Sequence, residues 1–332
     1  MVCQKDALVQ TISELYDQIS SLESLRPSKD VDMLFTQLVL TCIPPNPIDV
    51  TKLCNKIQEM RSKLIKLCGV AEGLLEMHYS TILGNSFGGV DGENPLDHLT
   101  IFPYYNNYLK LSLLEFNILS QHITNIPNRV AFLGSGPLPL TSIVLAKNHL
   151  TQTSFHNYDI DPMANAMASK LVASDCDLSR RMFFHTRDVL DVTCEFKDFD
   201  VVFLAALVGM DKEAKLGFIE HLAKNMSPGA ILMLRSAHGA RGFLYPIVDP
   251  CDLKGFEVLS VFHPTDEVIN SVVIARKLPD MATLMPLMPS SNNIHCGGNH
   301  VILPCKCADL QGFNPLSKLN MIEELAADDR LV

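Results

Sequence analysis

A glycine-rich turn between an apolar strand and a helix is the first feature of this sequence that could bind a ligand. The apolar run at 130–133 is followed by Gly134, Ser135 and Gly136, and then by a predicted helix. Because glycine has no Cβ, a ligand can approach the backbone closely there, beside the N–H groups of the helix N-terminus. Asp159 ends the next predicted strand about 25 residues later, the spacing at which Rossmann-like folds hold a ribose hydroxyl.

The turn lacks the third glycine of the dinucleotide fingerprint. We therefore expect a nucleoside without a pyrophosphate, which favours S-adenosylmethionine over NAD. Asp188, after the third predicted strand, is expected to face the adenine amine, with Val189 beside the ring. The structural alternative for Asp159 and Asp161 is that they only cap the next helix.

Basic side chains follow the fifth predicted strand. Arg235, His238 and Arg241 come at its carboxyl end, where open α/β sheets bind ligands. Arginine matches a carboxylate with two parallel hydrogen bonds, so a substrate with carboxylates is implied, bound by Arg235 and His238. The alternative for Arg241 is an ion pair with a surface acid. The end of the fourth strand, 205–209, is apolar, whereas amino-group methyltransferases often carry a polar motif at this place. This difference argues against methylation of an amide.

Composition excludes several classes of protein. The chain has 332 residues and a net charge of −10, which argues against a nucleic-acid partner. The N-terminus shows no secretory pattern, and the longest apolar run, 201–210, is too short to span a membrane. Ten cysteines without such a signal indicate reduced thiols and a cytoplasmic location.

Three regions follow from the hydrophobic periodicity. Residues 1–125 are predicted to form an all-α domain, because apolar residues recur there at helical spacing. The predicted helices are 4–25, 29–42 with Ser28 as N-cap, a third helix whose apolar face runs from 53 to 67 and which stops at Gly69, 71–83, and 106–122. Residues 126–277 alternate strands and helices, which indicates a parallel sheet covered on both faces. Residues 278–332 are proline-rich and are expected to form a mobile tail with a short helix at 320–327.

The predicted fold class is therefore α/β: a Rossmann-like seven-stranded sheet of the class I methyltransferase type, preceded by the helical domain. A short link at 263–267 suits a hairpin between the last two strands. The strands are predicted at 130–133, 154–158, 182–186, 201–207, 230–235, 256–262 and 268–276, and the helices between them at 138–149, 162–174 and 212–226.

The sequence resembles the plant nicotianamine synthases over about residues 1–277. The matching stretches are Leu-Leu-Glu-Met-His-Tyr-Ser at 74–80, Asn-Pro-Leu-Asp-His-Leu at 94–99, Ile-Phe-Pro-Tyr-Tyr-Asn-Asn-Tyr at 101–108, Gly-Ser-Gly-Pro-Leu-Pro at 134–139, Tyr-Asp-Ile-Asp-Pro at 158–162, and 235–246. The resemblance implies that three S-adenosylmethionine molecules condense. Each gives its 3-amino-3-carboxypropyl group and releases methylthioadenosine. The product would chelate iron, zinc and copper for transport.

The resemblance also points to the catalytic groups. An ammonium must lose a proton before it attacks, and a carboxylate in a partly apolar pocket can take that proton. Glu76, among leucines and a methionine in the 74–80 stretch, is the predicted base. Tyr105 is the second predicted catalytic residue, and Tyr104 and Tyr108 are predicted to bind substrate. The structural alternatives are a solvated helix-face glutamate and tyrosines at a domain seam.

Two other functions compete with this one. An ordinary S-adenosylmethionine-dependent methyltransferase acting on a small carboxylate would release S-adenosylhomocysteine instead. A non-catalytic metal-binding protein would use the tail side chains His295, Cys296, His300, Cys305 and Cys307, whose spacing fits no strong zinc site. We predict no metal site, no cofactor beyond S-adenosylmethionine, which is the substrate, and no transmembrane segment.

Overall fold

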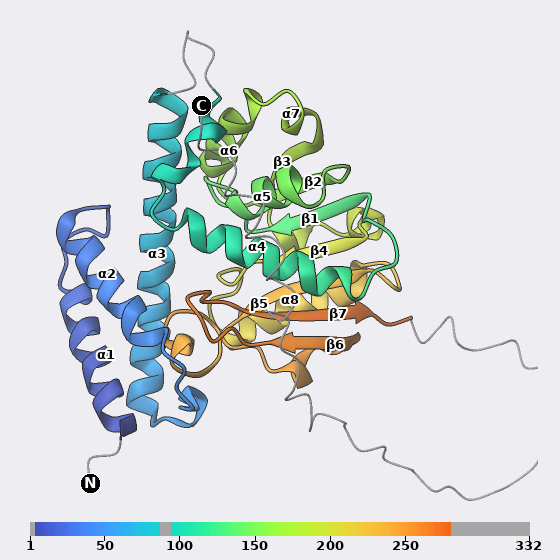
Figure 1. Ribbon diagram of the computed structural model, residues 1–332. Helices are drawn as coiled ribbons and strands as arrows, with labels where there is room; N and C mark the ends of the chain where they lie inside the picture. The colour runs from blue at the N-terminus through green and yellow to red at the C-terminus, as the bar shows by residue number, and fades with distance from the viewer. Residues whose placement is uncertain (1–3, 87–93, 280–332) are drawn as a thin grey trace, which may run out of the picture. The chain divides into compact units, whose positions relative to one another are not determined.

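Helices precede and flank a single sheet in the computed structural model, which describes residues 4–86 and 94–279 (Figure 1). These residues belong to one compact unit, Met1–Leu284. The helices are α1 Gln4–Ser20, α2 Lys29–Cys42, α3 Asn55–Ser86, α4 Tyr105–Ser120, α5 Leu140–Asn148, α6 Pro162–Ala173, α7 Leu178–Arg181 and α8 Lys212–Asn225. The strands are β1 Arg129–Leu133, β2 Ser154–Asp159, β3 Met182–Thr186, β4 Val201–Leu204, β5 Ile231–Ser236, β6 Phe256–Phe262 and β7 Ser271–Lys277.

The sheet has the predicted topology. Its strand order is β3-β2-β1-β4-β5-β7-β6. The pairs among β1 to β5 are parallel, whereas β7 is antiparallel to both β5 and β6. The Rossmann-like fold class and the terminal hairpin are therefore confirmed. Because the order reverses between β1 and β4, the loops after these two strands diverge and leave a crevice at their carboxyl ends.

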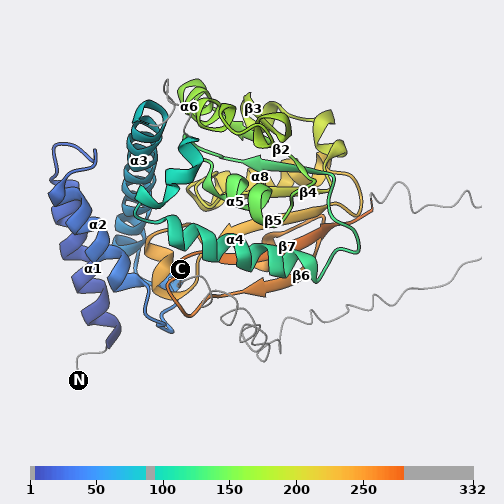
Figure 2. The same ribbon diagram turned by 45° about the horizontal axis from the view of Figure 1, so that its top comes forward.

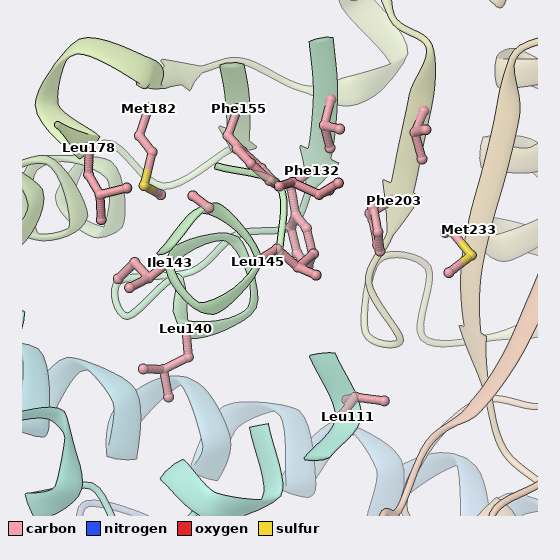
Figure 3. Close-up of a cluster of buried hydrophobic side chains, with 14 of the residues drawn as sticks. Leu111, Phe132, Leu140, Ile143, Leu145, Phe155, Leu178, Met182, Phe203 and Met233 are labelled. Carbon is pink, nitrogen blue, oxygen red and sulfur yellow. The ribbon is translucent and has the colours of Figure 1, made fainter. Parts of the chain in front are cut away.

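Alternate side chains of each strand pack on opposite faces of the sheet. Val130 and Phe132 of β1 belong to the cluster that α4, α5, α6 and α7 cover, whereas Ala131 and Leu133 belong to the cluster under α8. Figure 3 shows α5 between the phenylalanines of the sheet and Leu111 of α4. Burial of each large apolar side chain contributes about 1.5–3 kcal/mol to the stability of the fold. These two packed layers hold the strands that border the crevice in fixed positions.

Helix α3 differs from the prediction of two helices separated at Gly69. The structure has one helix of 32 residues, Asn55–Ser86. A Cβ built on Gly69 would lie 3.2 Å from Met210 Cε. Gly69 is therefore a site of close approach, where the loop after β4 lies against the helix. Tertiary packing of this kind outweighs the penalty of about 1 kcal/mol for glycine in a helix.

Helix α3 also connects the two halves of the unit. Figures 1 and 2 show it between the pair α1–α2 and the sheet. One of its faces packs in a third cluster, in which Leu38 of α2 and Leu64 of α3 meet Phe243 of the 3₁₀ helix Gly239–Phe243. Another face carries Glu72 and Glu76 toward the carboxyl ends of the strands.

One predicted helix cap is present, whereas several element boundaries differ from the predicted ones. Ser28 caps α2 by accepting from the Val31 N–H, as predicted. Strand β4 ends three residues before the predicted 207, β7 begins at Ser271, and α5 begins after Pro139. The short helix α7 was not predicted. The predicted helix at 320–327 and the tail cysteines and histidines lie outside the described residues. Within those residues, no helix has the length and apolar character to cross a membrane.

Candidate active site

A cavity of about 590 Å³ opens at the carboxyl ends of the parallel strands. Its floor is the Gly134–Gly136 turn, and its sides are the ends of β2, β3 and β4 together with one face of α3. Nine of the predicted site residues line it: Glu76, Tyr108, Gly134, Ser135, Gly136, Asp159, Asp188, Val189 and Arg235. The topology therefore brings together residues from positions 76 to 235 of the chain.

The turn has the left-handed backbone that glycine permits. Gly134 has φ 79° and Gly136 has φ 67°. A Cβ on Gly134 would lie 2.3 Å from Val208 Cγ2, so the loop after β4 packs directly on the turn. The Gly136 N–H donates to Asp159 Oδ2 at 2.9 Å. This bond fixes the Asp159 carboxylate at the mouth of the turn.

Asp159 and Asp161 have different roles. Asp161 is the N-cap of α6 and accepts from the Met163 N–H at 2.8 Å. Asp159 does not cap the helix; it lines the cavity and accepts from the N–H groups of Gly136 and Asp161. The capping alternative therefore holds for Asp161 alone, and Asp159 has carboxylate lone pairs left for ligand hydroxyls.

Three further residues of the cavity wall fit a nucleoside. The Ser135 hydroxyl is buried and has no hydrogen-bond partner among the described residues. Buried polar atoms are almost always paired, so this one indicates a ligand group. Asp188 accepts from the Leu190 N–H at 2.9 Å, and Val189 is buried next to it. A carboxylate beside an apolar side chain suits an adenine amine and ring.

Glu76 lies against the turn, although it comes from α3. Its side chain is 9% exposed, and a Cβ on Gly136 would lie 2.5 Å from Glu76 Oε2. The Tyr108 hydroxyl donates to Glu76 Oε1 at 3.2 Å. Burial, followed by the charge of Glu72, holds the pKa of Glu76 well above its usual value. A carboxylate with a raised pKa, facing a ligand pocket, is suited to accept a proton.

Glu72, which was not among the predicted residues, lies one helical turn before Glu76. The Tyr245 hydroxyl donates to Glu72 Oε2 at 2.9 Å, and the Tyr108 hydroxyl lies 3.4 Å from Glu72 Oε1. Burial raises the pKa of Glu72 as well. Glu72 and Glu76 are four residues apart on one predicted helix, and this spacing could have identified Glu72 from the sequence.

A second cavity of about 290 Å³ lies behind Glu72, between helices α2, α3 and α4. Four residues line both cavities: Glu72, Tyr108, Tyr245 and Asn270. The Asn270 side-chain nitrogen is buried and has no hydrogen-bond partner among the described residues. The wall between the cavities is therefore polar, whereas the smaller cavity is otherwise largely apolar.

The three neighbouring tyrosines have separate places. Tyr108 lines both cavities, Tyr104 lines only the smaller one, and Tyr105, at the start of α4, lines neither. Tyr105 packs instead against the cluster that covers the sheet. The structure thus places the Tyr108 hydroxyl, rather than that of Tyr105, next to the predicted base. The catalytic prediction for Tyr105 has no geometric support, because helix α4 turns that side chain toward the core.

Arg235 lines the cavity, but a buried acid holds its guanidinium. Its Nε donates to Glu115 Oε1 at 2.7 Å, and its Nη2 donates to Glu115 Oε2 at 3.0 Å and to Thr141 Oγ1 at 2.7 Å. Arg235 also lies 5.6 Å from the centre of the Phe132 ring. This fork uses Nε and Nη2, so Nη1 is the part of the guanidinium that has no hydrogen-bond partner among the described residues. Glu115 lies 120 residues from Arg235 in the sequence, and nothing in the sequence linked the two.

His238 and Arg241 do not reach the cavity, contrary to the substrate-binding prediction for His238. His238 is exposed and stacks on His263, with ring centroids 4.1 Å apart. Arg241 is buried and donates to the backbone oxygens of Ile43, Pro264 and Asp266. The 3₁₀ helix Gly239–Phe243 turns away from the sheet edge after β5. Arg241 therefore fastens this helix to its neighbours, and it forms no ion pair with a surface acid among the described residues.

The apolar end of β4 is held by a buried lysine that sequence analysis missed. Lys215 Nζ donates to the oxygens of Ala205 at 3.1 Å and Ala206 at 2.8 Å. Burial lowers the pKa of Lys215 to about 7. A neutral amine has two N–H donors, which match the two carbonyls. Lys215 thus shapes the cavity wall from behind.

Lys215 should make stability depend on pH. The unfolded lysine keeps its proton up to about pH 10, whereas the folded one loses it above about 7. The unfolded state then binds more protons, so this group adds about 1 kcal/mol of stability per pH unit between these values. In urea unfolding at pH 7, 8 and 9, the free energy of unfolding of the wild type should rise with pH relative to that of Lys215→Met. Lys224→Met, at an exposed position of the same helix, should show no such trend; a constant difference for Lys215→Met would contradict the role.

No metal site accompanies these residues in the described part of the chain, where no three His, Cys, Asp or Glu side chains are grouped to hold an ion. The polar groups that converge on the cavity include backbone N–H groups, hydroxyls, an amide and carboxylates. Such a set fits an organic ligand that carries both hydroxyl and ammonium groups.

Solved structures share this architecture. The crystal structure of MtNAS in complex with MTA and tNA superposes with a TM-score of 0.67, at 22% identity, over 83% of this chain and 99% of that one. A mutant of MtNAS in complex with S-adenosylmethionine gives a TM-score of 0.65 over 82% of this chain and 98% of that one, also at 22% identity. These similarities establish the fold.

Sequence comparison goes further. The family model described as nicotianamine synthase protein matches residues 2–282. A nicotianamine synthase of Solanum lycopersicum is 64% identical over 332 residues, covering 99% of this chain and 100% of the relative. A probable nicotianamine synthase 4 of Arabidopsis thaliana is 67% identical over 94% of this chain and 96% of its own length. Identity of this degree across whole chains exceeds what a shared fold produces, and the chain belongs to the nicotianamine synthase family.

Proposed function

We propose that this chain makes nicotianamine from three S-adenosylmethionine molecules and that Glu76 is the base of each condensation. The observation that carries the proposal is the buried Glu76 carboxylate lying against Gly136 of the nucleoside-binding turn. A base placed there faces the ligand at the point where the helix N-terminus and Asp159 would hold it. Membership of the nicotianamine synthase family supports the same reaction.

Different residues of the cavity are proposed to bind different parts of S-adenosylmethionine. Asp159 is proposed to accept the ribose hydroxyls, and Asp188 and Val189 to hold the adenine. The turn at 134–136, with the Ser135 hydroxyl, would then meet the amino-acid part of the molecule. Arg235, held by Glu115 and Thr141, supplies the positive charge for a carboxylate.

The chemistry needs a free amine next to the sulfonium of a second molecule. Glu76 takes a proton from the acceptor ammonium, and the amine attacks the methylene carbon beside the sulfur. The carbon–sulfur bond breaks, its electron pair stays on sulfur, and neutral methylthioadenosine leaves. The new secondary ammonium loses its extra proton in turn. Repetition with a second donor, followed by ring closure on a third sulfonium, gives the azetidine of nicotianamine.

Tyr108 is the tyrosine that we assign to this chemistry. Its hydroxyl donates to Glu76 and so holds that carboxylate toward the cavity. Tyr104 lines only the smaller cavity, behind Glu72, so we propose no substrate contact for it. We propose no catalytic role for Tyr105 and no substrate contact for His238.

Incubation of the purified chain with S-adenosylmethionine alone tests the proposed reaction. Mass spectrometry should find methylthioadenosine and nicotianamine in a ratio of three to one, because each of the three carbon–nitrogen bonds releases one nucleoside. The methyltransferase alternative predicts S-adenosylhomocysteine, and only when a methyl acceptor is added. The metal-binding alternative predicts that S-adenosylmethionine is not consumed. Either of these outcomes would contradict the proposal.

The location proposed for this reaction is the cytoplasm. Cys42 and Cys68 are buried free thiols, and burial raises the pKa of Cys42 to about 12. Such thiols are unreactive and suit a reducing compartment. S-Adenosylmethionine is the proposed small-molecule partner, and no further cofactor is invoked.

A further inference from the structure

One hydroxyl lies between two carboxylates in the wall of the active site. Tyr108, on α4, has its hydroxyl oxygen 3.2 Å from Glu76 Oε1 and 3.4 Å from Glu72 Oε1. The two glutamates are neighbours on one face of α3, because residues four apart lie one above the other on a helix. A hydroxyl can donate one hydrogen bond and accept another. The geometry therefore connects Glu76 to Glu72 through a single exchangeable proton.

Glu72 differs from Glu76 in what surrounds it. Glu76 contacts the nucleoside-binding turn at Gly136, whereas Glu72 lines both cavities. Its second oxygen accepts from the Tyr245 hydroxyl at 2.9 Å. The other charged or titratable groups that interact with the Glu72 or Glu76 carboxyl are Arg235 from β5, Asp159 from β2, Cys68 from α3 and Tyr104 at the start of α4.

We propose that Glu72 is the second carboxylate of a proton relay that regenerates Glu76 between condensations; this inference rests on the proposed function. After Glu76 has taken a proton from the acceptor ammonium, its carboxyl passes a proton to the Tyr108 oxygen, while the Tyr108 hydroxyl proton moves to Glu72 Oε1. Tyr108 ends as a neutral hydroxyl, Glu76 regains its negative charge, and Glu72 becomes a carboxylic acid. Glu72 then releases the proton to water in the smaller cavity.

The need for a relay follows from the number of protons. Three carbon–nitrogen bonds form on one growing molecule, and each leaves a proton that Glu76 must lose before it can act again. While a donor nucleoside and the acceptor occupy the cavity at Glu76, they would stand between its carboxyl and solvent. The smaller cavity on the other side of the Glu72–Tyr108–Tyr245 wall offers a separate exit.

The order of methylthioadenosine release in Glu72→Gln tests this proposal. Glutamine keeps the shape of the side chain and its contact with Tyr245, but it cannot take the proton. In rapid-quench experiments, the ratio of the first release rate to the later release rates should rise by about 100-fold or more over the wild type, the lower end of the range for one lost acid–base contribution. Formate added at millimolar concentration should partly restore the later releases by acting as a small external base.

The control is Glu59→Gln, which removes an exposed carboxylate from the same helix. Its release pattern should match the wild type. If Glu72→Gln slows the first and later releases by the same factor, or slows neither, the relay is overturned. Absence of methylthioadenosine from the wild type would instead refute the proposed function, so the two failures are distinguishable.

A second measurement uses the unmodified protein and so does not depend on the folding of a variant. In heavy water, release after the first condensation should show a larger solvent isotope effect than the first release, because two protons move in the regeneration step. Equal isotope effects on all three releases would overturn the relay.

Discussion

Glu76→Gln should lower the rate of methylthioadenosine release by about 10²–10⁴-fold, the range for loss of a general base, while leaving the Kd for S-adenosylmethionine unchanged. The amide has the same shape as the carboxylate and can still contact Gly136 and Tyr108, but it cannot take a proton from the acceptor ammonium. Single-turnover kinetics and isothermal titration with S-adenosylmethionine measure the two quantities separately.

The pH profile gives this prediction a second readout. Burial and the neighbouring charge of Glu72 raise the pKa of Glu76, and only the carboxylate form is a base. The wild-type rate should therefore rise as the pH rises through that raised pKa. The residual rate of Glu76→Gln should lack this rise. A variant that kept the wild-type rate and profile would show that another group is the base.

Gly136→Ala should lower activity by at least about 100-fold, the cost of misplacing a catalytic group by about 1 Å. The new methyl group would lie 2.5 Å from Glu76 Oε2, and the left-handed backbone with φ 67° would be strained as well. The carboxylate must move away from the turn, or the turn must open and lose the hydrogen bond to Asp159. Steady-state kinetics with S-adenosylmethionine measure the loss.

Gly229→Ala is the matched control for this substitution. Gly229 has φ 87°, but a Cβ there meets nothing within 4 Å. It therefore carries the backbone strain of about 1–2 kcal/mol without the clash. Its activity should stay near that of the wild type despite a lower melting temperature. Equal activity in the two variants would mean that the contact between Gly136 and Glu76 is not needed.

Much of the fold was predictable because its signals are local. Four apolar residues at 130–133, the Gly-Ser-Gly turn and Asp159 lie within about 30 residues, which is the length of one βαβ unit. Each signal also agrees with the hydrophobic period of the element in which it occurs. The error at Gly69 arose because glycine is also a stop signal, and only the position of Met210 distinguishes the two uses.

The candidate site was less predictable, because much of it depends on contacts between distant segments. Glu115 holds Arg235 across 120 residues, and Tyr245 donates to Glu72 across 173. No periodicity records such pairs. His238 was predicted from its place after β5, but the chain turns away there and stacks the ring on His263.

A crystal structure with S-adenosylmethionine bound tests the central claim most directly. We expect the ribose hydroxyls on Asp159, the adenine beside Val189, and the Glu76 carboxylate facing the α-amine of the acceptor unit. A nucleoside bound away from the Gly134–Gly136 turn, or a Glu76 side chain turned out to bulk solvent, would contradict this claim.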